Sequence, residues 1–347
     1  MNNQPIEALN FVESVRKRPG MFIGSVGIKG FNELLKQVFE ALQEYVPDAF
    51  VFEMGFYPGN RVVLELRDQL EEKLSTHIAT WDKYDPVYDI DWIKALVALS
   101  SDTYIQAGDL ELSSKRGHFT TSVATPSGNA EVIIDFTIDP EIFKDYQLVY
   151  DQVNPFLQQF AYLNPGLKII SKEHQGEDFQ RRVFYYPRGI FEQMEHHLHS
   201  FYFPEHAFKL YLETKVGDYE YRVVICDNKW PDKGFIQTFA GNKTLIEGGS
   251  LENGLIDGLI SAIKLLAEHS GLNIHINRKE LKKHIAFMAV VKGRDFVFEG
   301  CTRTKLAMPF VKKEVQQKIH NSLLAYHQSE PKKTDALLQK FLIRNEA

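Results

Sequence analysis

Residues 15–24 read Val-Arg-Lys-Arg-Pro-Gly-Met-Phe-Ile-Gly, and residues 298–306 read Phe-Glu-Gly-Cys-Thr-Arg-Thr-Lys-Leu. Both stretches place cations beside glycine and apolar residues. Closely spaced cations usually mark a solvated surface, and that interpretation suits either stretch taken alone. What decides the fold is that three further segments of recognisable pattern lie between them in a fixed order.

Composition describes an ordinary globular protein. The 347 residues suffice for two domains, and the apolar fraction of 44% and charged fraction of 25% are typical of folded chains. No apolar run reaches the roughly 18 residues that span a bilayer, and the N-terminus lacks the basic-then-apolar layout of a signal peptide. The two cysteines give no disulfide framework or metal pair. We expect a cytoplasmic protein that does not enter membranes.

The charge balance gives no general preference for nucleic acid. The formal net charge is -6, so there is no basic field over the whole molecule. Local basic clusters exist, and DNA contact through a groove lined by several of them stays open. They are Arg16 to Arg18, Arg278 to Lys283, Lys312 with Lys313, and Lys332 with Lys333.

Periodicity predicts alternating helices and strands. Apolar residues recur every three or four positions over 30–46, which predicts an amphipathic helix ended by Pro47. Pro58-Gly59-Asn60 predicts the turn of a hairpin. Further helices are expected over 91–100, 140–162 and 251–269. The break at Pro187-Arg188-Gly189 predicts a domain boundary, giving domains 1–186 and 187–347.

Five segments in order resemble the N-terminal ATPase region of the DNA gyrase B and topoisomerase IV ParE subunit family. The resemblance implies an α/β protein: a GHKL-type two-layer α/β sandwich followed by a transducer α/β domain. It also implies that the chain stops before the family's metal-binding Toprim region, so that it cannot cut DNA unaided. The matching segments are residues 15–24, 136–143, 160–169, 244–250 and 298–306.

The family places its catalytic base and its magnesium ligand four residues apart on one helix, as E-x-x-x-N. Val-Phe-Glu at 38–40 aligns with the family's V-F-E, so the resemblance puts Glu40 at the base position. Glu44 stands at the magnesium position, where the family has asparagine. A carboxylate can bind magnesium, but extra negative charge disfavours a triphosphate. Alternatively, both residues are simply the polar face of the helix.

The family's adenine-binding aspartate lies in D-x-G-x-G after a strand. Asp68 can take this position, but Gln69 or Leu70 stands in place of the first glycine and Glu71 in place of the second. Glycine allows the backbone to approach a ligand closely, and side chains there would fill the space. An ordinary aspartate at the end of a strand is an equal alternative for Asp68.

The family's phosphate-binding loop G-x-x-G-x-G is the sharpest loss. The helix that follows it is present at 95–100, but residues 88–93 before it read Tyr-Asp-Ile-Asp-Trp-Ile and contain no glycine. Loop amides and a helix N-terminus bind phosphate, whereas Asp89 and Asp91 repel it. Val132 stands where the family has a hydrogen-bonding threonine, and 69–90 is too short and glycine-free for the usual ATP lid.

The transducer's Q-T-K loop corresponds to Cys301-Thr302-Arg303. The resemblance gives Arg303 the cation position, with Lys305 as a possible substitute, although arginine and lysine are not interchangeable. A surface charge or an interdomain ion pair is the alternative for Arg303. The histidines at 196, 197 and 199 lack a second ligand cluster, so no metal site is expected.

Three functional hypotheses follow, and the third is a structural interaction protein unrelated to DNA. The first is a pseudoenzyme: a degenerate ATPase that serves as a binding or dimerisation module and needs no cofactor. The second is an active ATP-driven gate of a type II topoisomerase, using ATP and Mg²⁺ and acting with partner subunits. Whether the chain is an enzyme stays open. The partners considered are a second copy, gyrase or topoisomerase subunits, and DNA.

Overall fold

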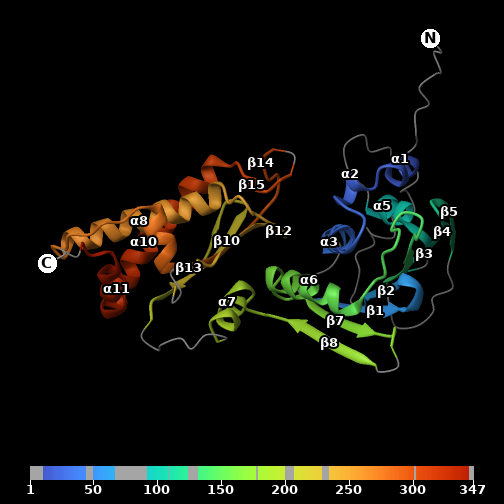
Figure 1. The fold of residues 1–347 in the computed structure, drawn as a ribbon, viewed down its shortest axis with the longest axis horizontal. Helices are drawn as coiled ribbons and strands as arrows, with labels where there is room; N and C mark the ends of the chain where they lie inside the picture. Colours follow the sequence, from blue (N-terminus) through green and yellow to red (C-terminus); the bar gives the residue numbers. More distant parts are fainter. Residues whose placement is uncertain are drawn as a thin grey trace, which may run out of the picture. The chain divides into compact units, whose positions relative to one another are not determined.

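The structure is a computed structural model that describes residues 11–43, 50–66, 92–108, 110–123, 132–176, 179–199, 207–228, 234–300 and 302–343. The chain divides into two compact units, Met1–Pro187 and Arg188–Ala347 (Figure 1). Each unit has its own hydrophobic core.

The first unit is built on one eight-stranded sheet with the order β5-β4-β3-β6-β2-β1-β7-β8. Neighbouring strands are antiparallel except β1 and β7, which are parallel. The strands are β1 Val51–Tyr57, β2 Arg61–Leu66, β3 Ser100–Ala107, β4 Leu110–Lys115, β5 His118–Val123, β6 Val132–Ile138, β7 Lys168–Glu173 and β8 Gln180–Tyr185.

Helices cover one face of this sheet (Figure 1). Strand β6 shows the consequence, because its residues alternate between buried and partly exposed along the strand, as expected when one face is covered. Phe31, Leu35 and Phe39 of α3 are fully or almost fully buried in the same core. The helices are α1 Phe11–Lys17, α2 Gly20–Ile23, α3 Ile28–Gln43, α5 Trp92–Leu99 and α6 Tyr150–Leu163.

Local sequence signals located several of these elements. The helix predicted over 30–46 is α3, and the one predicted over 91–100 is α5. The predicted hairpin is formed by β1 and β2, with Gly59 and Asn60 in the left-handed region at φ of 76° and 64°. The helix predicted from residue 140 was wrong at its start, because α6 begins only at Tyr150. Residues 139–143 instead form a turn around Asp139.

A buried ion pair joins two of the family-like segments of the first unit. The Asp139 carboxylate is fully buried and accepts a hydrogen bond from Arg16 Nη2 at 2.6 Å. Arg16 Nη1 also donates to the carbonyl oxygen of Ala98 at 2.9 Å, near the C-terminal end of α5. The backbone N–H of Asp139 donates to the Leu99 carbonyl at 3.0 Å. Segment 15–24, the end of α5 and segment 136–143 are therefore fixed to one another.

The second unit contains a five-stranded sheet with the order β12-β11-β13-β10-β9, in which only the β11–β13 pair is parallel. A separate two-stranded ribbon is formed by β14 and β15. The strands are β9 Lys209–Val216, β10 Tyr219–Asp227, β11 Ile236–Ala240, β12 Lys243–Thr244, β13 Ile285–Lys292, β14 Phe298–Glu299 and β15 Lys305–Leu306. The helices are α7 Ile190–His199, α8 Ser250–His269, α9 Arg278–His284, α10 Pro309–Ser329 and α11 Pro331–Leu338.

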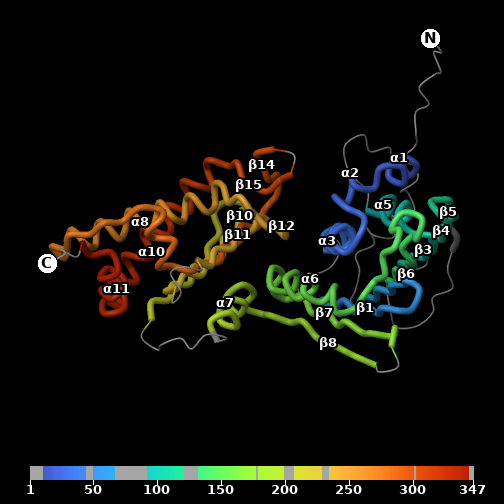
Figure 2. The backbone as a smooth tube through the Cα atoms, in the orientation of Figure 1, coloured from blue at the N-terminus to red at the C-terminus, as the bar shows by residue number. Residues whose placement is uncertain are grey.

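Helices α8 and α10 run side by side (Figure 2). Two glycines one turn apart on α8, Gly254 and Gly258, allow the backbones to approach closely. A Cβ atom at Gly258 would lie only 2.6 Å from the Gln316 carbonyl oxygen, and one at Gly254 would clash with the Lys312 carbonyl. The predicted helix over 251–269 thus packs through its smallest residues.

We predict that Arg16→Met destabilises the first unit by about 3–5 kcal/mol, because it leaves the buried Asp139 carboxylate unpaired. Denaturant unfolding of the full chain measures the loss. The control is Lys17→Met on the exposed neighbouring residue, which should change stability by less than about 0.5 kcal/mol. Equal effects of the two substitutions would contradict the structural role of the ion pair.

We predict that Gly258→Val lowers the stability of the second unit by about 1–3 kcal/mol, since the added carbons meet the backbone of α10. Calorimetric melting is the measurement. Lys264→Val places the same side chain on an exposed position of α8 and should cost only its helix propensity, about 0.5 kcal/mol. A Gly258→Val protein that melts like Lys264→Val would show that α8 and α10 do not meet at this point.

Candidate functional site

Helix α3 carries the predicted base position. Glu40 lies in the C-terminal half of α3 and is partly buried, and the neighbouring Val38 and Phe39 anchor the helix in the core. One turn earlier, Gln37 Nε2 donates to the Phe22 carbonyl at 3.2 Å and ties α3 to α2. Glu44 and Asp68 lie outside the described residues, as does the whole of 67–91. Of the predicted nucleotide-site residues in this unit, the structure describes Glu40 alone.

Val132, which stands where the family has a threonine, has apolar neighbours on both adjacent strands. Val132 opens β6 and pairs with Leu66 at the end of β2 and with Ala107 at the end of β3. The exposed fractions of these three side chains are 0%, 1% and 1%. Val132 therefore belongs to the hydrophobic core, beside the end of β2.

The first turn of α5 is filled with bulky residues. Trp92 and Ile93 open the helix, and both are buried. The indole Nε1 of Trp92 is buried and has no hydrogen-bond partner among the described residues. The resemblance assigns phosphate binding to this helix end, but its side chains belong to the core.

The second unit brings Arg303 and Lys305 together on the ribbon of β14 and β15. Arg303 is exposed and has the left-handed φ of 54°. Lys305 Nζ forms an ion pair with Glu299 at 2.6 Å, and this contact raises the pKa of Lys305. Within the described part of the chain Arg303 has no ion-pair partner. Arg303 is therefore the uncompensated cation of the ribbon.

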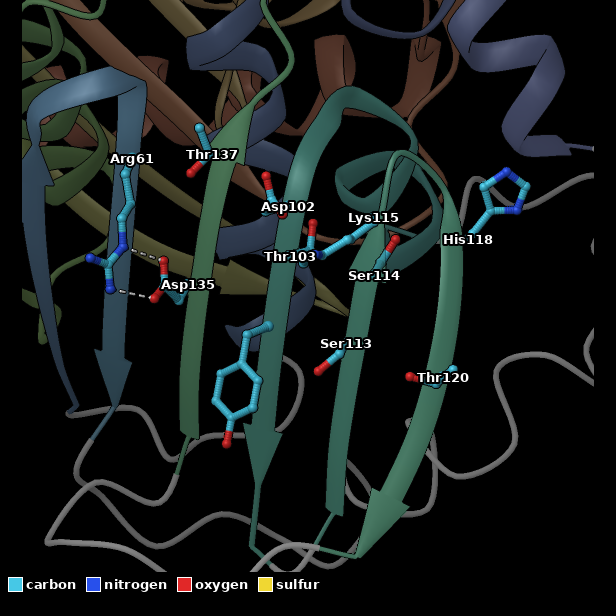
Figure 3. A pocket seen from close by; sticks show the side chains of 11 residues that line it. Arg61, Asp102, Thr103, Ser113, Ser114, Lys115, His118, Thr120, Asp135 and Thr137 are labelled. Carbon is cyan, nitrogen blue, oxygen red and sulfur yellow. Dashed lines mark hydrogen bonds and ion pairs between the residues drawn. The ribbon is translucent and has the colours of Figure 1, made fainter.

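A groove of about 540 Å³ lies on the face of the first sheet opposite the helices that the structure describes (Figure 3). Strand register places its polar side chains in rows across β2, β6, β3, β4 and β5. The sequence analysis did not predict this groove, although every second residue of β6 is less buried than its neighbours, which is the pattern of a strand with one partly exposed face. The lining residues are Arg61, Asp102, Thr103, Tyr104, Ser113, Ser114, Lys115, His118, Thr120, Asp135 and Thr137.

The charges of this groove are balanced. Arg61 donates two hydrogen bonds to Asp135, at 2.6 and 2.9 Å, and this contact raises the pKa of Arg61. Lys115 and Asp102 are cross-strand neighbours of opposite charge. Burial, with a hydrogen bond to Glu111, raises the pKa of Tyr104 to about 12, so its hydroxyl stays protonated. Such a surface suits polar neutral groups and does not select a polyanion.

Among the residues that the structure describes, no group of three or more potential metal ligands occurs. His197 stacks on Phe235 with ring centroids 3.8 Å apart, and burial lowers the pKa of His197. None of the described helices is both long and apolar enough to cross a membrane.

Comparison with known proteins agrees with this architecture. Residues 199–347 match the family model described as DNA gyrase B. The chain is 27% identical to the DNA gyrase B protein of Archaeoglobus fulgidus, in an alignment covering 99% of this chain and 58% of that protein. For the corresponding protein of Clostridium acetobutylicum the identity is 25%, with the same coverage. The chain thus spans a little over half the length of these curated relatives.

Solved structures share the fold. The 43K ATPase domain of Thermus thermophilus gyrase B, solved with an aminocoumarin, superimposes with a TM-score of 0.73 at 22% identity, covering 95% of this chain and 93% of that one. The DNA gyrase B protein of Myxococcus xanthus gives 0.78 at 19% identity, covering 95% and 99%. The predicted fold class, a GHKL-type sandwich followed by a transducer α/β domain, is confirmed.

The protein is thus a chain of two α/β units with the fold of the gyrase B ATPase region. Its resemblance to the N-terminal ATPase region of the DNA gyrase B and topoisomerase IV family, predicted from five segments, is confirmed along nearly the whole chain.

We predict that Val132→Thr destabilises the first unit by about 1–3 kcal/mol, because a buried hydroxyl without a partner is costly. Urea unfolding measures the change. Val63→Thr, on the partly exposed face of neighbouring β2, is the control and should cost less than about 1 kcal/mol. A neutral Val132→Thr would mean that this position faces an open, hydrated cavity.

Proposed function

We propose that this chain is a gyrase B-like module whose nucleotide site is degenerate, a pseudo-ATPase that acts by binding or dimerisation. In this proposal residues 1–186 form the ATPase-like domain and residues 187–347 the transducer domain. The partner is a second copy, a gyrase or topoisomerase subunit, or DNA, and the protein works in the cytoplasm.

One observation carries the proposal: at the helix end where the family binds phosphate, the side chains are buried in the hydrophobic core. The residues before α5 contain no glycine and include Asp89 and Asp91, and its first turn buries Trp92 and Ile93. A triphosphate needs bare amide donors and a positive helix end. Bulk and negative charge oppose both requirements.

Two further features support the loss of nucleotide binding. The buried Val132 offers no hydrogen bond where the family uses a hydroxyl. Gln69 or Leu70, and Glu71, stand where the family has the glycines after Asp68, and glycine is the residue that lets a backbone approach a ligand closely. In this proposal the protein uses no cofactor and does not hydrolyse ATP.

The alternative is an active ATP-driven gate of a type II topoisomerase with partner subunits. It is favoured by Glu40, which remains partly buried on α3, and by the exposed Arg303 on its ribbon. In that case Glu40 is the base, Glu44 holds Mg²⁺, Asp68 binds adenine, and Arg303 or Lys305 contacts the terminal phosphate.

Calorimetric titration of the full chain with a non-hydrolysable ATP analogue and Mg²⁺ separates the two functions. We expect no binding at concentrations up to about 1 mM, and the same result for Glu40→Gln. The ATPase domain of Thermus thermophilus gyrase B serves as the positive control. Binding in the low micromolar range would overturn the pseudo-ATPase proposal.

If ATP turnover is detected, the Glu40→Ala variant decides the mechanism. Turnover abolished by this substitution supports the active gate, since a base normally contributes about 10²–10⁴-fold. Turnover that survives it rules out the mechanism with Glu40 as base.

A further inference from the structure

The cation-bearing ribbon is held by the segment Thr244 to Ser250, another of the family-like stretches. The backbone N–H of Glu247 donates to the Thr304 carbonyl at 3.1 Å, and the N–H of Leu306 donates to the Gly248 carbonyl at 3.1 Å. Gly249 and Leu306 form a parallel bridge. The two segments therefore pair along their backbones although more than fifty residues separate them.

Glu247 holds Thr304 with its side chain as well as its backbone. The Thr304 hydroxyl donates to Glu247 Oε1 at 2.6 Å, a distance typical of a hydrogen bond to an ionised carboxylate. The Thr302 and Thr304 hydroxyls are 3.1 Å apart, which extends the contact along the ribbon. Thr304 lies between Arg303 and Lys305, so fixing it fixes the backbone that carries both cations.

The same segment ties the ribbon to two long helices. Gly249 is the N-cap of α8, with φ of 105°, and a side chain there would clash with the backbone of Leu306. Ser250 Oγ accepts a hydrogen bond of 2.8 Å from the Met308 N–H, just before α10. Gly248-Gly249 thus acts as a strand-to-helix turn that accommodates the ribbon.

We propose that Glu247 is a positioning residue: its carboxylate sets the ribbon so that Arg303 is presented, already ordered, to an oxyanion. The inference rests on the proposed function in one respect, that this module acts by binding a partner. Arg303 is taken as the ligand-facing cation because it is exposed and has no ion-pair partner among the described residues. Glu299 neutralises Lys305, so the ribbon offers a single guanidinium suited to bidentate contact with phosphate or carboxylate.

Hydrogen exchange of the full chain tests the positioning. In Glu247→Ala and Thr304→Val we expect exchange over residues 302–306 to accelerate about tenfold, the effect of losing one hydrogen bond to a charged group. Thr304→Ser keeps the hydroxyl and should exchange like the wild type. Glu299→Ala, the matched control, removes a neighbouring carboxylate but leaves the Glu247–Thr304 contact intact. Unchanged exchange in Glu247→Ala would overturn the proposal.

Line broadening of inorganic pyrophosphate in ³¹P spectra at low salt tests the oxyanion. We expect broadening with the wild type, Thr304→Ser and Glu299→Ala, and a loss of at least about fivefold in Arg303→Ala and Glu247→Ala, as for a contact worth about 1 kcal/mol. No broadening with the wild type overturns the oxyanion assignment, and so does broadening that Arg303→Ala leaves unchanged. The calorimetric titration with the ATP analogue tests the pseudo-ATPase proposal separately, so the two failures are distinguishable.

Discussion

The first unit depends on the buried carboxylate of Asp139. An unpaired charge at this depth would cost several kcal/mol, and Arg16 offsets that cost. The same guanidinium binds the Ala98 carbonyl, so the pair also fixes the C-terminal end of α5. The helix is thus held from the end opposite to the one where phosphate would bind. Substitutions at the phosphate end of α5 leave this anchor untouched, so the scaffold of the first unit does not depend on nucleotide binding.

In the second unit the corresponding constraint is the close approach of backbones at glycine residues. Gly254 and Gly258 let α8 approach the backbone of α10, and Gly249 lets the ribbon approach the start of α8. These positions tolerate no Cβ because the neighbouring atoms are backbone, which cannot rotate away. The family-like segments that persist, 15–24, 136–143 and 244–250, all make contacts within their own unit. They are retained features of the scaffold, whether or not a nucleotide binds.

Local sequence patterns predicted individual helices and the hairpin, but they could not predict contacts between residues far apart in the chain. The spacing of Phe31, Leu35 and Phe39 sufficed for α3, and Pro58-Gly59-Asn60 sufficed for the hairpin. The start of α6 was missed because Asp139 organises the preceding turn through Arg16, 123 residues away. The Arg61–Asp135 pair and its groove require the register of β2 and β6, which no local signal carries. Glu40 and Arg303 were located by family resemblance alone, and their roles remain predictions.

The charge pattern limits what the proposed module can bind. An exposed ion pair contributes about 0–1 kcal/mol, so Arg303 alone binds a free oxyanion only weakly. The groove on the first sheet adds no net positive charge. A macromolecular partner can bind more tightly than a free nucleotide, because its oxyanion contact to Arg303 can be supplemented by contacts elsewhere on its surface. The retained cation, held in place by Glu247, is therefore better suited to orienting a partner than to holding a nucleotide.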